Sequence, residues 1–225
     1  MKSDIYMFLI YSILVVGILY CVPPKWRNIW VLLSSMLFYL ICDYRFFLLM
    51  LAETAVSYYL GIKIEKDAKC KRYLVIGIAF IIVILFVFKY FNFFIEIFAS
   101  GAGIAELVMP VGISYFSFRM ISYLADIYQE KRTAESSFVI YGAYVSFFPH
   151  MLCGPIARSE GMTKQLKTGI SYREDLFVRG CELIIAGMFK KVVIADRLGD
   201  YVGLMFQSPS GYPALALWMG AVFYS

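Results

Sequence analysis

Long apolar runs, one after another along the chain, constrain this protein more than any other feature of its sequence. The run at 73–98 contains only two charged residues, Lys89 and Glu96. It is longer than the roughly 20 apolar residues that an α-helix needs to cross a bilayer. We therefore expect an integral membrane protein built from helices.

The other runs extend this expectation to the whole chain. Hydrophobic residues make up 61% of the sequence and charged residues only 16%, whereas soluble domains have about a quarter charged residues. We predict an all-α polytopic helix bundle that forms a single domain over 1–225. The predicted spans lie at 5–22, 29–42, 46–62, 73–98, 107–127 and 176–195, with an incomplete span at 213–225.

The charges of the loops predict an orientation. Lys and Arg are frequent in the loops 23–28, 63–72 and 128–137, whereas 43–45 has one Arg and 99–106 has neither residue. Basic loops stay in the cytoplasm. The alternation predicts a multi-pass protein of the cytoplasmic membrane with its N-terminus outside.

The run at 138–157 does not fit this alternation as a span. The loop that follows it, 158–175, carries four Lys or Arg and would lie outside if the run crossed the membrane. Pro149 and Pro155 remove backbone donors, and Gly154 lies between them. Non-helical backbone at membrane depth is tolerated only inside protein or against a water-filled cavity. We therefore expect 138–157 to be a re-entrant element.

Several classes of function are disfavoured. The net charge of +5 comes from Lys and Arg scattered over short loops, whereas a nucleic-acid binder gathers them on one face. The five cysteines form no C-x-x-C pair, and the chain has one histidine, so no zinc site or disulfide framework is indicated. We predict no bound metal, no bound cofactor and no nucleic-acid partner.

Polar residues within the span 107–127 are candidates for a functional site. Tyr115, Arg119, Ser122 and Asp126 follow one another at i, i+4, i+7 and i+11, which places them on one helix face. A charge at membrane depth costs about 2.5–3.5 kcal/mol by insertion scales. The stripe is therefore either the wall of a polar cavity or a set of structural hydrogen-bonding groups.

Other candidates also allow two interpretations. His150 has the side chain best suited to act as a general base near neutral pH, but it also fits a structural position in a broken helix. Glu53 is either a pathway residue or a hydrogen-bonded structural group. Lys190 and Lys191 are either snorkelling anchors or a platform for an anionic donor.

Three stretches taken together resemble a known family. They are MPVGISYFSFRMISYLADIYQ at 109–129, SFFPHMLCGPIAR at 146–158 and GMFKKVVIADRL at 187–198. In this order, among apolar runs of this kind, they are similar to the membrane-bound O-acyltransferase family. The greatest similarity is to the bacterial branch of alginate and cell-wall polysaccharide O-acetylases.

The resemblance implies a multi-span enzyme that moves an acyl group, acetyl in this branch. The donor would be a cytoplasmic thioester, acetyl-CoA or an acyl carrier, and the acceptor a hydroxyl of an extracytoplasmic polysaccharide. The implied partners are the bilayer, the polysaccharide, and an acyl carrier or other acetylation proteins. The implied substrate-tunnel residues are Tyr115, Arg119, Ser122, Asp126, Pro149, His150, Gly154 and Pro155. The implied donor- or carrier-binding residues are Arg158, Lys190 and Lys191.

The resemblance also concerns the general base. The family uses a histidine to deprotonate the attacking hydroxyl, and it lies in a later apolar segment, beyond residue 225. We therefore expect the chain to be the N-terminal part of such an enzyme, inactive alone, with no catalytic residue assigned in it and with His150 lining the tunnel. The alternatives are a membrane transporter or channel, and a non-catalytic membrane fragment.

Overall fold

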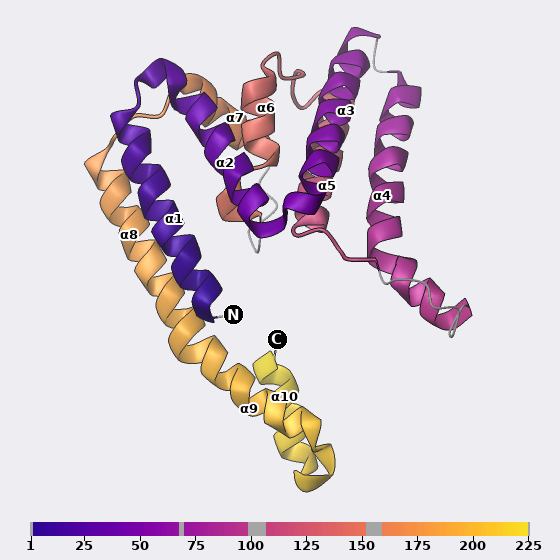
Figure 1. Cartoon of the computed structure of the whole chain (residues 1–225), viewed down its shortest axis with the longest axis vertical. Helices are drawn as coiled ribbons and strands as arrows, with labels where there is room; N and C mark the ends of the chain where they lie inside the picture. Colours follow the sequence, from indigo (N-terminus) through magenta and orange to yellow (C-terminus); the bar gives the residue numbers. More distant parts are fainter. Residues whose placement is uncertain (1, 68–69, 99–106, 152–158, 225) are drawn as a thin grey trace. The chain divides into compact units, whose positions relative to one another are not determined.

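The computed structural model describes residues 2–67, 70–98, 107–151 and 159–224. Within these ranges the chain forms helices and connecting segments and no β-strand, which confirms the all-α prediction (Figure 1). The chain divides into two compact units, residues 1–170 and 171–225.

Four long helices open the first unit: α1 (Lys2–Cys21), α2 (Arg27–Asp43), α3 (Phe47–Lys66) and α4 (Lys71–Phe98). They overlap the apolar runs at 5–22, 29–42, 46–62 and 73–98. A short 3₁₀ turn at Pro24–Trp26 precedes α2, and another at Tyr44–Phe46 precedes α3.

The remainder of the first unit is more broken. It holds α5 (Ile113–Tyr128), α6 (Phe138–Val145), a 3₁₀ turn at Phe148–His150 and α7 (Ser159–Thr168). The sequence predicted a span from 107, but α5 begins at Ile113. Pro110 lies just before that start, and Gly112 has a φ of 72°, a left-handed conformation that other residues rarely adopt.

Glycines bring three helices of the first unit close together. α3 and α4 lie side by side, and α5 packs against both (Figure 1). A Cβ atom at Gly61 would lie 2.7 Å from Cε1 of Tyr123, and one at Gly77 would lie 2.8 Å from Cδ1 of Leu124. Small residues allow such close helix packing in membrane proteins. The two glycines therefore make room for α5.

An aromatic cluster anchors the 3₁₀ turn at Phe148–His150 to the first two helices. The Phe148 ring centroid lies 5.4 Å from that of Phe38 and 5.3 Å from that of Tyr11. Aromatic pairs at these distances are favourable, so the turn has a fixed place beside α1 and α2.

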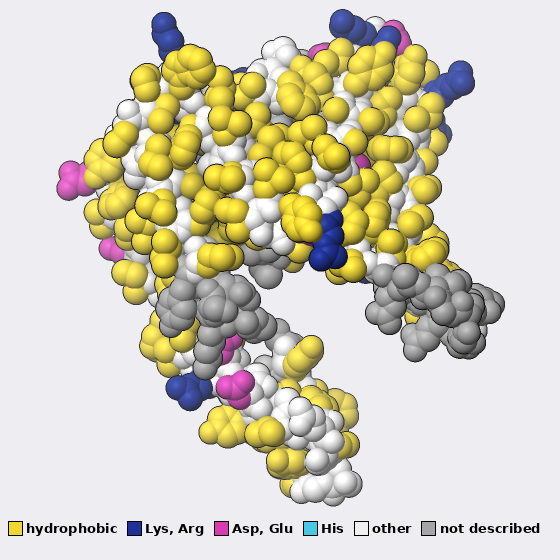
Figure 2. All heavy atoms as spheres, viewed as in Figure 1, with side chains coloured by type: hydrophobic (Ala, Val, Ile, Leu, Met, Phe, Trp, Pro, Cys, Tyr) yellow, Lys and Arg dark blue, Asp and Glu magenta, His cyan; other side chains and the backbone are white. Residues whose placement is uncertain are grey.

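The outer surface of the first unit is strongly apolar. Two helical stretches in the described part are long and apolar enough to cross a membrane, Pro24–Lys66, which includes α2 and α3, and Lys71–Phe91 in α4. Only 11% of the apolar window in Lys71–Phe91 is buried within the protein. On the visible face of this unit, hydrophobic side chains predominate, and Lys and Arg lie towards its edges (Figure 2). This surface suits contact with lipid hydrocarbon.

The second unit contains α8 (Glu174–Phe189), a π-helical segment at Lys190–Ala195, α9 (Asp196–Gln207) and α10 (Ala214–Tyr224). α10 packs against α9, where a Cβ atom at Gly220 would lie 3.6 Å from Sδ of Met205. Large apolar side chains of this unit are exposed, including Leu183 at 67% and Ile185 at 69%. The unit buries little apolar surface of its own.

Candidate functional site

Arg119 is the central residue of the candidate site. Its side chain is almost fully buried in α5, and Nη1 donates to the carbonyl oxygens of Tyr144 at 3.3 Å and Val145 at 3.0 Å. These carbonyls end α6, where helix carbonyls lack partners and carry partial negative charge. Nε and Nη2 of Arg119 have no hydrogen-bond partner among the described residues. Arg119 therefore caps a broken helix and retains free donor capacity.

The helix of the motif at 109–129 contacts both α6 and the motif that follows α6. The Tyr144 hydroxyl donates to the Arg119 carbonyl oxygen at 3.4 Å, so the contact between α5 and the end of α6 is reciprocal. A Cβ atom at Gly112 would lie 2.7 Å from the Met151 carbonyl oxygen. The motif at 109–129 thus packs closely against the described part of the motif at 146–158.

The break in this second motif has clear local causes. Pro149 lies in the 3₁₀ turn and lacks a backbone N–H. The Phe148 N–H is satisfied by Ser35 Oγ of α2 at 3.3 Å, and the Ser146 hydroxyl donates to the Gly142 carbonyl at 2.7 Å. α6 therefore ends after only eight residues, and the broken backbone is supported by side chains.

His150 lies at the border between this turn and a cavity. Its side chain is half-buried, and Nδ1 is buried without a hydrogen-bond partner in the part of the chain that the structure describes. The ring lies edge-on to Phe147, with centroids 5.1 Å apart. An activated general base is expected to have an acidic residue that orients its imidazole. No such residue contacts His150 among the described residues.

The other residues of the α5 stripe are less buried than Arg119. Tyr115, Ser122 and Asp126 are all half-buried, and the neighbouring residues Phe116, Met120, Tyr123, Leu124 and Ile127 form the fully buried face. The polar stripe therefore runs along the edge of the core-facing surface.

The remaining predicted site residues fall elsewhere. Lys190 and Lys191 are exposed in the second unit, where the Lys191 ammonium pairs with the Asp196 carboxylate. Gly154, Pro155 and Arg158 lie outside the described residues.

A polar clasp that the sequence did not indicate joins the chain before α6 to α7. The Glu135 side chain is fully buried, and its Oε2 lies 2.9 Å from Lys167 Nζ and 3.7 Å from Arg132 Nη2. Arg132 Nη2 also donates to Thr163 Oγ1 at 3.4 Å. The Glu135 N–H donates to the Tyr123 hydroxyl at 2.9 Å. We name these five residues the Glu135 clasp.

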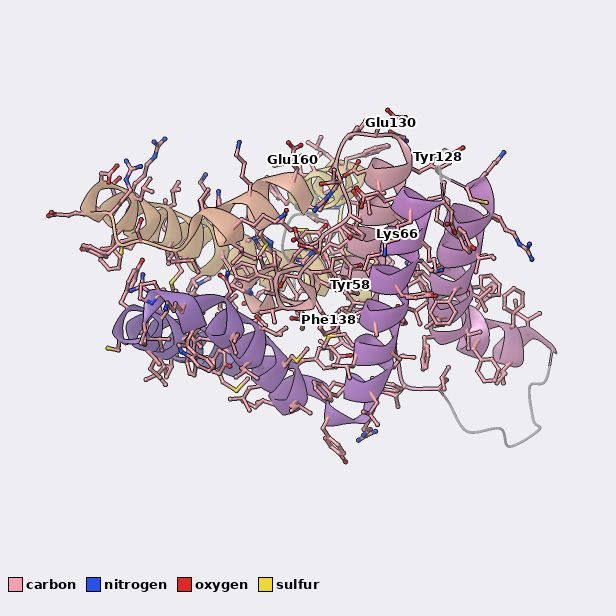
Figure 3. All side chains as sticks on the ribbon, turned by 90° about the horizontal axis from the view of Figure 1, so that it is seen from above. Tyr58, Lys66, Tyr128, Glu130, Phe138 and Glu160 are labelled. Atoms are coloured by element: carbon pink, nitrogen blue, oxygen red, sulfur yellow. The ribbon has the colours of Figure 1, made fainter. Side chains whose placement is uncertain are left out.

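α3 supports the same region. The Tyr58 hydroxyl donates to the Ser136 carbonyl at 2.6 Å, and its ring lies 5.3 Å from that of Phe138. Figure 3 looks onto this end of the first unit, where Tyr58, Phe138, Glu130 and Glu160 are labelled. The segment before α6 is thus held from α3, α5 and α7.

Glu53 of α3 is fully buried. Both of its carboxylate oxygens lack a hydrogen-bond partner among the residues that the structure describes. The same is true of the buried Tyr39 hydroxyl of α2 and the Ser117 hydroxyl of α5. Buried polar groups are normally hydrogen-bonded, so the interior of this unit contains several polar atoms with unused bonding capacity.

The chain is similar over its whole length to named bacterial proteins. It is 30% identical to the probable alginate O-acetylase of Pseudomonas aeruginosa, with 100% of this chain and 45% of the relative covered. It is also 30% identical to the corresponding protein of Azotobacter vinelandii, with 100% and 47% covered. The peptidoglycan O-acetyltransferase of Helicobacter pylori is 27% identical, with 92% of this chain and 45% of the relative covered.

The chain spans about half the length of the curated relatives it matches. No family model matches it, and no solved structure gives a significant match. The relatives and the two apolar helical stretches together indicate a membrane protein. The resemblance that the three motifs indicated is thereby confirmed, and the chain is similar over its whole length to proteins named as probable alginate O-acetylases.

Proposed function

We propose that this chain forms part of a membrane-bound O-acyltransferase that moves an acetyl group to a hydroxyl of an extracytoplasmic polysaccharide. The donor is a cytoplasmic thioester, acetyl-CoA or an acyl carrier, and it is a substrate, not a bound cofactor. One observation carries this proposal beyond sequence similarity: the motif at 109–129 packs against the motif at 146–158 at Gly112 and Met151, and its Arg119 caps the helix that leads into the second motif.

The segment 138–157 is, in this proposal, a re-entrant element of a multi-pass bundle. α6 has eight residues, which is about 12 Å of helix, against a hydrocarbon thickness of about 30 Å. The Glu135 clasp joins the residues before α6 to Thr163 and Lys167 of α7, which supports a path that enters and returns at the same end of the unit. The basic loops 128–137 and 158–175 then share the cytoplasmic side, as the charge rule requires, and the N-terminus lies outside.

The interior around Arg119 is proposed to border the substrate path. At membrane depth, two groups here need polar partners: a guanidinium with two unpaired nitrogens, and the end of a broken helix. Only protein or water can supply those partners. Tyr115, Ser122 and Asp126 would continue this polar wall along α5. His150 would line the path at the turn and is not proposed as the general base, because it faces Phe147 and a largely apolar cavity.

The donor side is proposed to involve the second unit. Lys190 and Lys191 are exposed cations that would attract the phosphates of the donor or an acidic carrier surface. Arg158 is proposed for the same role.

An O-acetyl transfer assay on the full gene product tests the proposal. Membranes that contain the protein are given radiolabelled acetyl donor, and label in the polysaccharide is counted. Arg119→Ala is expected to abolish transfer, because it removes the cap of α6 and leaves two buried carbonyls unpaired. His150→Ala is expected to keep at least a tenth of the wild-type rate. Exposed Arg72→Ala is the matched control for Arg119→Ala.

Unchanged transfer by Arg119→Ala would refute the assigned site. Loss of all transfer in His150→Ala, with the protein still folded, would refute the assignment of His150 as a lining residue. No labelled polysaccharide from the wild-type protein, with any thioester donor, would refute the proposed function.

A further inference from the structure

A cavity of about 650 Å³ lies within the first unit, between α1, α2, α7 and the turn that holds His150. Its volume is in the range of about 300–1,000 Å³ that is usual for ligand pockets. The side chains that line it are mainly apolar, including Val15, Val16, Leu19, Val31, Met162 and Leu166. The Ser34 hydroxyl, also in the lining, already donates to the Val31 carbonyl at 3.1 Å. The cavity therefore suits the apolar part of a ligand.

The wall that α1 contributes is also an outer surface of the protein. Val16 lines the cavity and is 39% exposed, and nearby Ile13 of the same helix is 70% exposed. In a bilayer these side chains contact hydrocarbon. A lipid acyl chain is therefore the apolar group that lies next to this wall and can enter the cavity.

The start of α2 is bonded to the end of α7 and to the residue that follows it. The Arg27 guanidinium donates to the carbonyl of Ile170, and Asn28 Nδ2 donates to the carbonyl of Leu166 at 3.1 Å. Ile170 and Leu166 both line the cavity, so Arg27 stands at its edge.

The charge at this edge is in excess. No ion pair joins Arg27 to a carboxylate in the described ranges. Lys25 is exposed on the turn just before Arg27, two residues away along the chain. Two cations without a carboxylate partner among the described residues favour a negatively charged headgroup.

We propose that this cavity binds one acyl chain of an anionic phospholipid, whose phosphate is held by Arg27 and Lys25. The apolar lining takes the chain, and the basic edge selects the headgroup. His150 borders both this cavity and the proposed substrate path. The lipid is neither donor nor acceptor, and its retention is measured without acetyl transfer, so a failure of this proposal is distinct from a failure of the proposed function.

Lipid retention measured by native mass spectrometry tests the headgroup assignment. The purified chain is exchanged into detergent that contains equal amounts of phosphatidylglycerol and phosphatidylcholine with the same acyl chains. We expect one bound lipid per chain, with phosphatidylglycerol preferred. Arg27→Gln and Lys25→Gln are each expected to lower this preference about fivefold, the effect of about one surface charge on anionic lipid. Exposed Lys66→Gln is the control and is expected to leave the preference unchanged.

A pair of glycine substitutions tests the cavity itself. Gly161 lines the cavity, and a Cβ atom there would meet nothing within 4 Å, so Gly161→Leu fills space without a backbone clash. Gly17 of α1 is equally open but does not line the cavity, which makes Gly17→Leu the matched control. Lipid retention is expected to fall at least tenfold in Gly161→Leu and to persist in Gly17→Leu.

Three outcomes would overturn the proposal. The wild-type protein retains no lipid, it retains lipids of the two headgroups equally, or the Gly161→Leu variant retains as much lipid as the wild type. Should Gly161→Leu fail to fold, the two edge variants still decide the headgroup assignment.

Discussion

Gly61→Ala is a small change with a large expected effect, because α3 packs tightly against α5 at this residue. The added methyl would lie 2.7 Å from Cε1 and 3.1 Å from the hydroxyl oxygen of Tyr123, and 3.2 Å from Cδ1 of Ile127. The Tyr123 ring is fully buried, and its hydroxyl accepts the hydrogen bond of the Glu135 N–H. The ring therefore cannot move without disturbing the Glu135 clasp.

The magnitude follows from three contributions. Overpacking a buried contact costs about 1–3 kcal/mol, and loss of the Tyr123–Glu135 hydrogen bond costs about 1 kcal/mol more. Alanine in place of glycine in a helix returns up to about 1 kcal/mol. We expect a net loss of about 2 kcal/mol in the free energy of unfolding, which is about a 30-fold change in the folding equilibrium constant.

Unfolding in mixed micelles by titration with a denaturing detergent, followed by circular dichroism, measures this change. Gly17→Ala is the matched control, because it makes the same substitution in a helix with nothing within 4 Å of the new methyl. We expect Gly17→Ala to match or exceed the stability of the wild type. If Gly61→Ala is as stable as Gly17→Ala, then the close approach of α3 and α5 is wrong.

Two further predictions concern the Glu135 clasp and the topology. Lys167→Ala is expected to lower the free energy of unfolding by about 1–2 kcal/mol, less than for a fully buried ion pair because the Lys167 side chain is half exposed. Lys164→Ala, at another exposed lysine of α7, should change the stability little. Equal unfolding midpoints for the two variants would show that the Glu135 clasp does not stabilise the protein. In a background without native cysteines, Glu130→Cys and Glu160→Cys are expected to react with a membrane-impermeant maleimide from the same side, and Arg45→Cys from the other. Labelling of Glu130→Cys and Glu160→Cys from opposite sides would exclude a re-entrant segment between them.

The helices could be predicted from the sequence because lipid exposure demands long apolar runs, which are visible without any partner. α5 begins six residues after the start of the predicted span 107–127, because the apolar pattern continues through 107–112 while Pro110 and the left-handed Gly112 interrupt the backbone. Polar residues inside apolar runs were equally visible, so Arg119 and His150 were found as candidates. Their roles depend on which segments meet in space, which spacing alone does not give.

The Glu135 clasp shows this limit most clearly. Glu135 lies in a loop among other polar residues, where a carboxylate carries no sign of burial. Its partner Lys167 belongs to another charged segment, and the two meet only because α6 and α7 pack together. Likewise, the sequence could not predict that Arg119 Nε and Nη2 lack hydrogen-bond partners among the described residues, because this depends on the folded structure.

The π-helical segment at Lys190–Ala195 has a consequence for how the second unit presents its surfaces. A wide turn of this kind accommodates about one additional residue, and each residue of an α-helix advances the side chains by about 100°. The helical phase therefore shifts between α8 and α9, although the backbone continues through both. α8 and α9 can thus direct their apolar sides towards different neighbours, and deletion of a single residue from KKVVIA would bring the two stripes back into line.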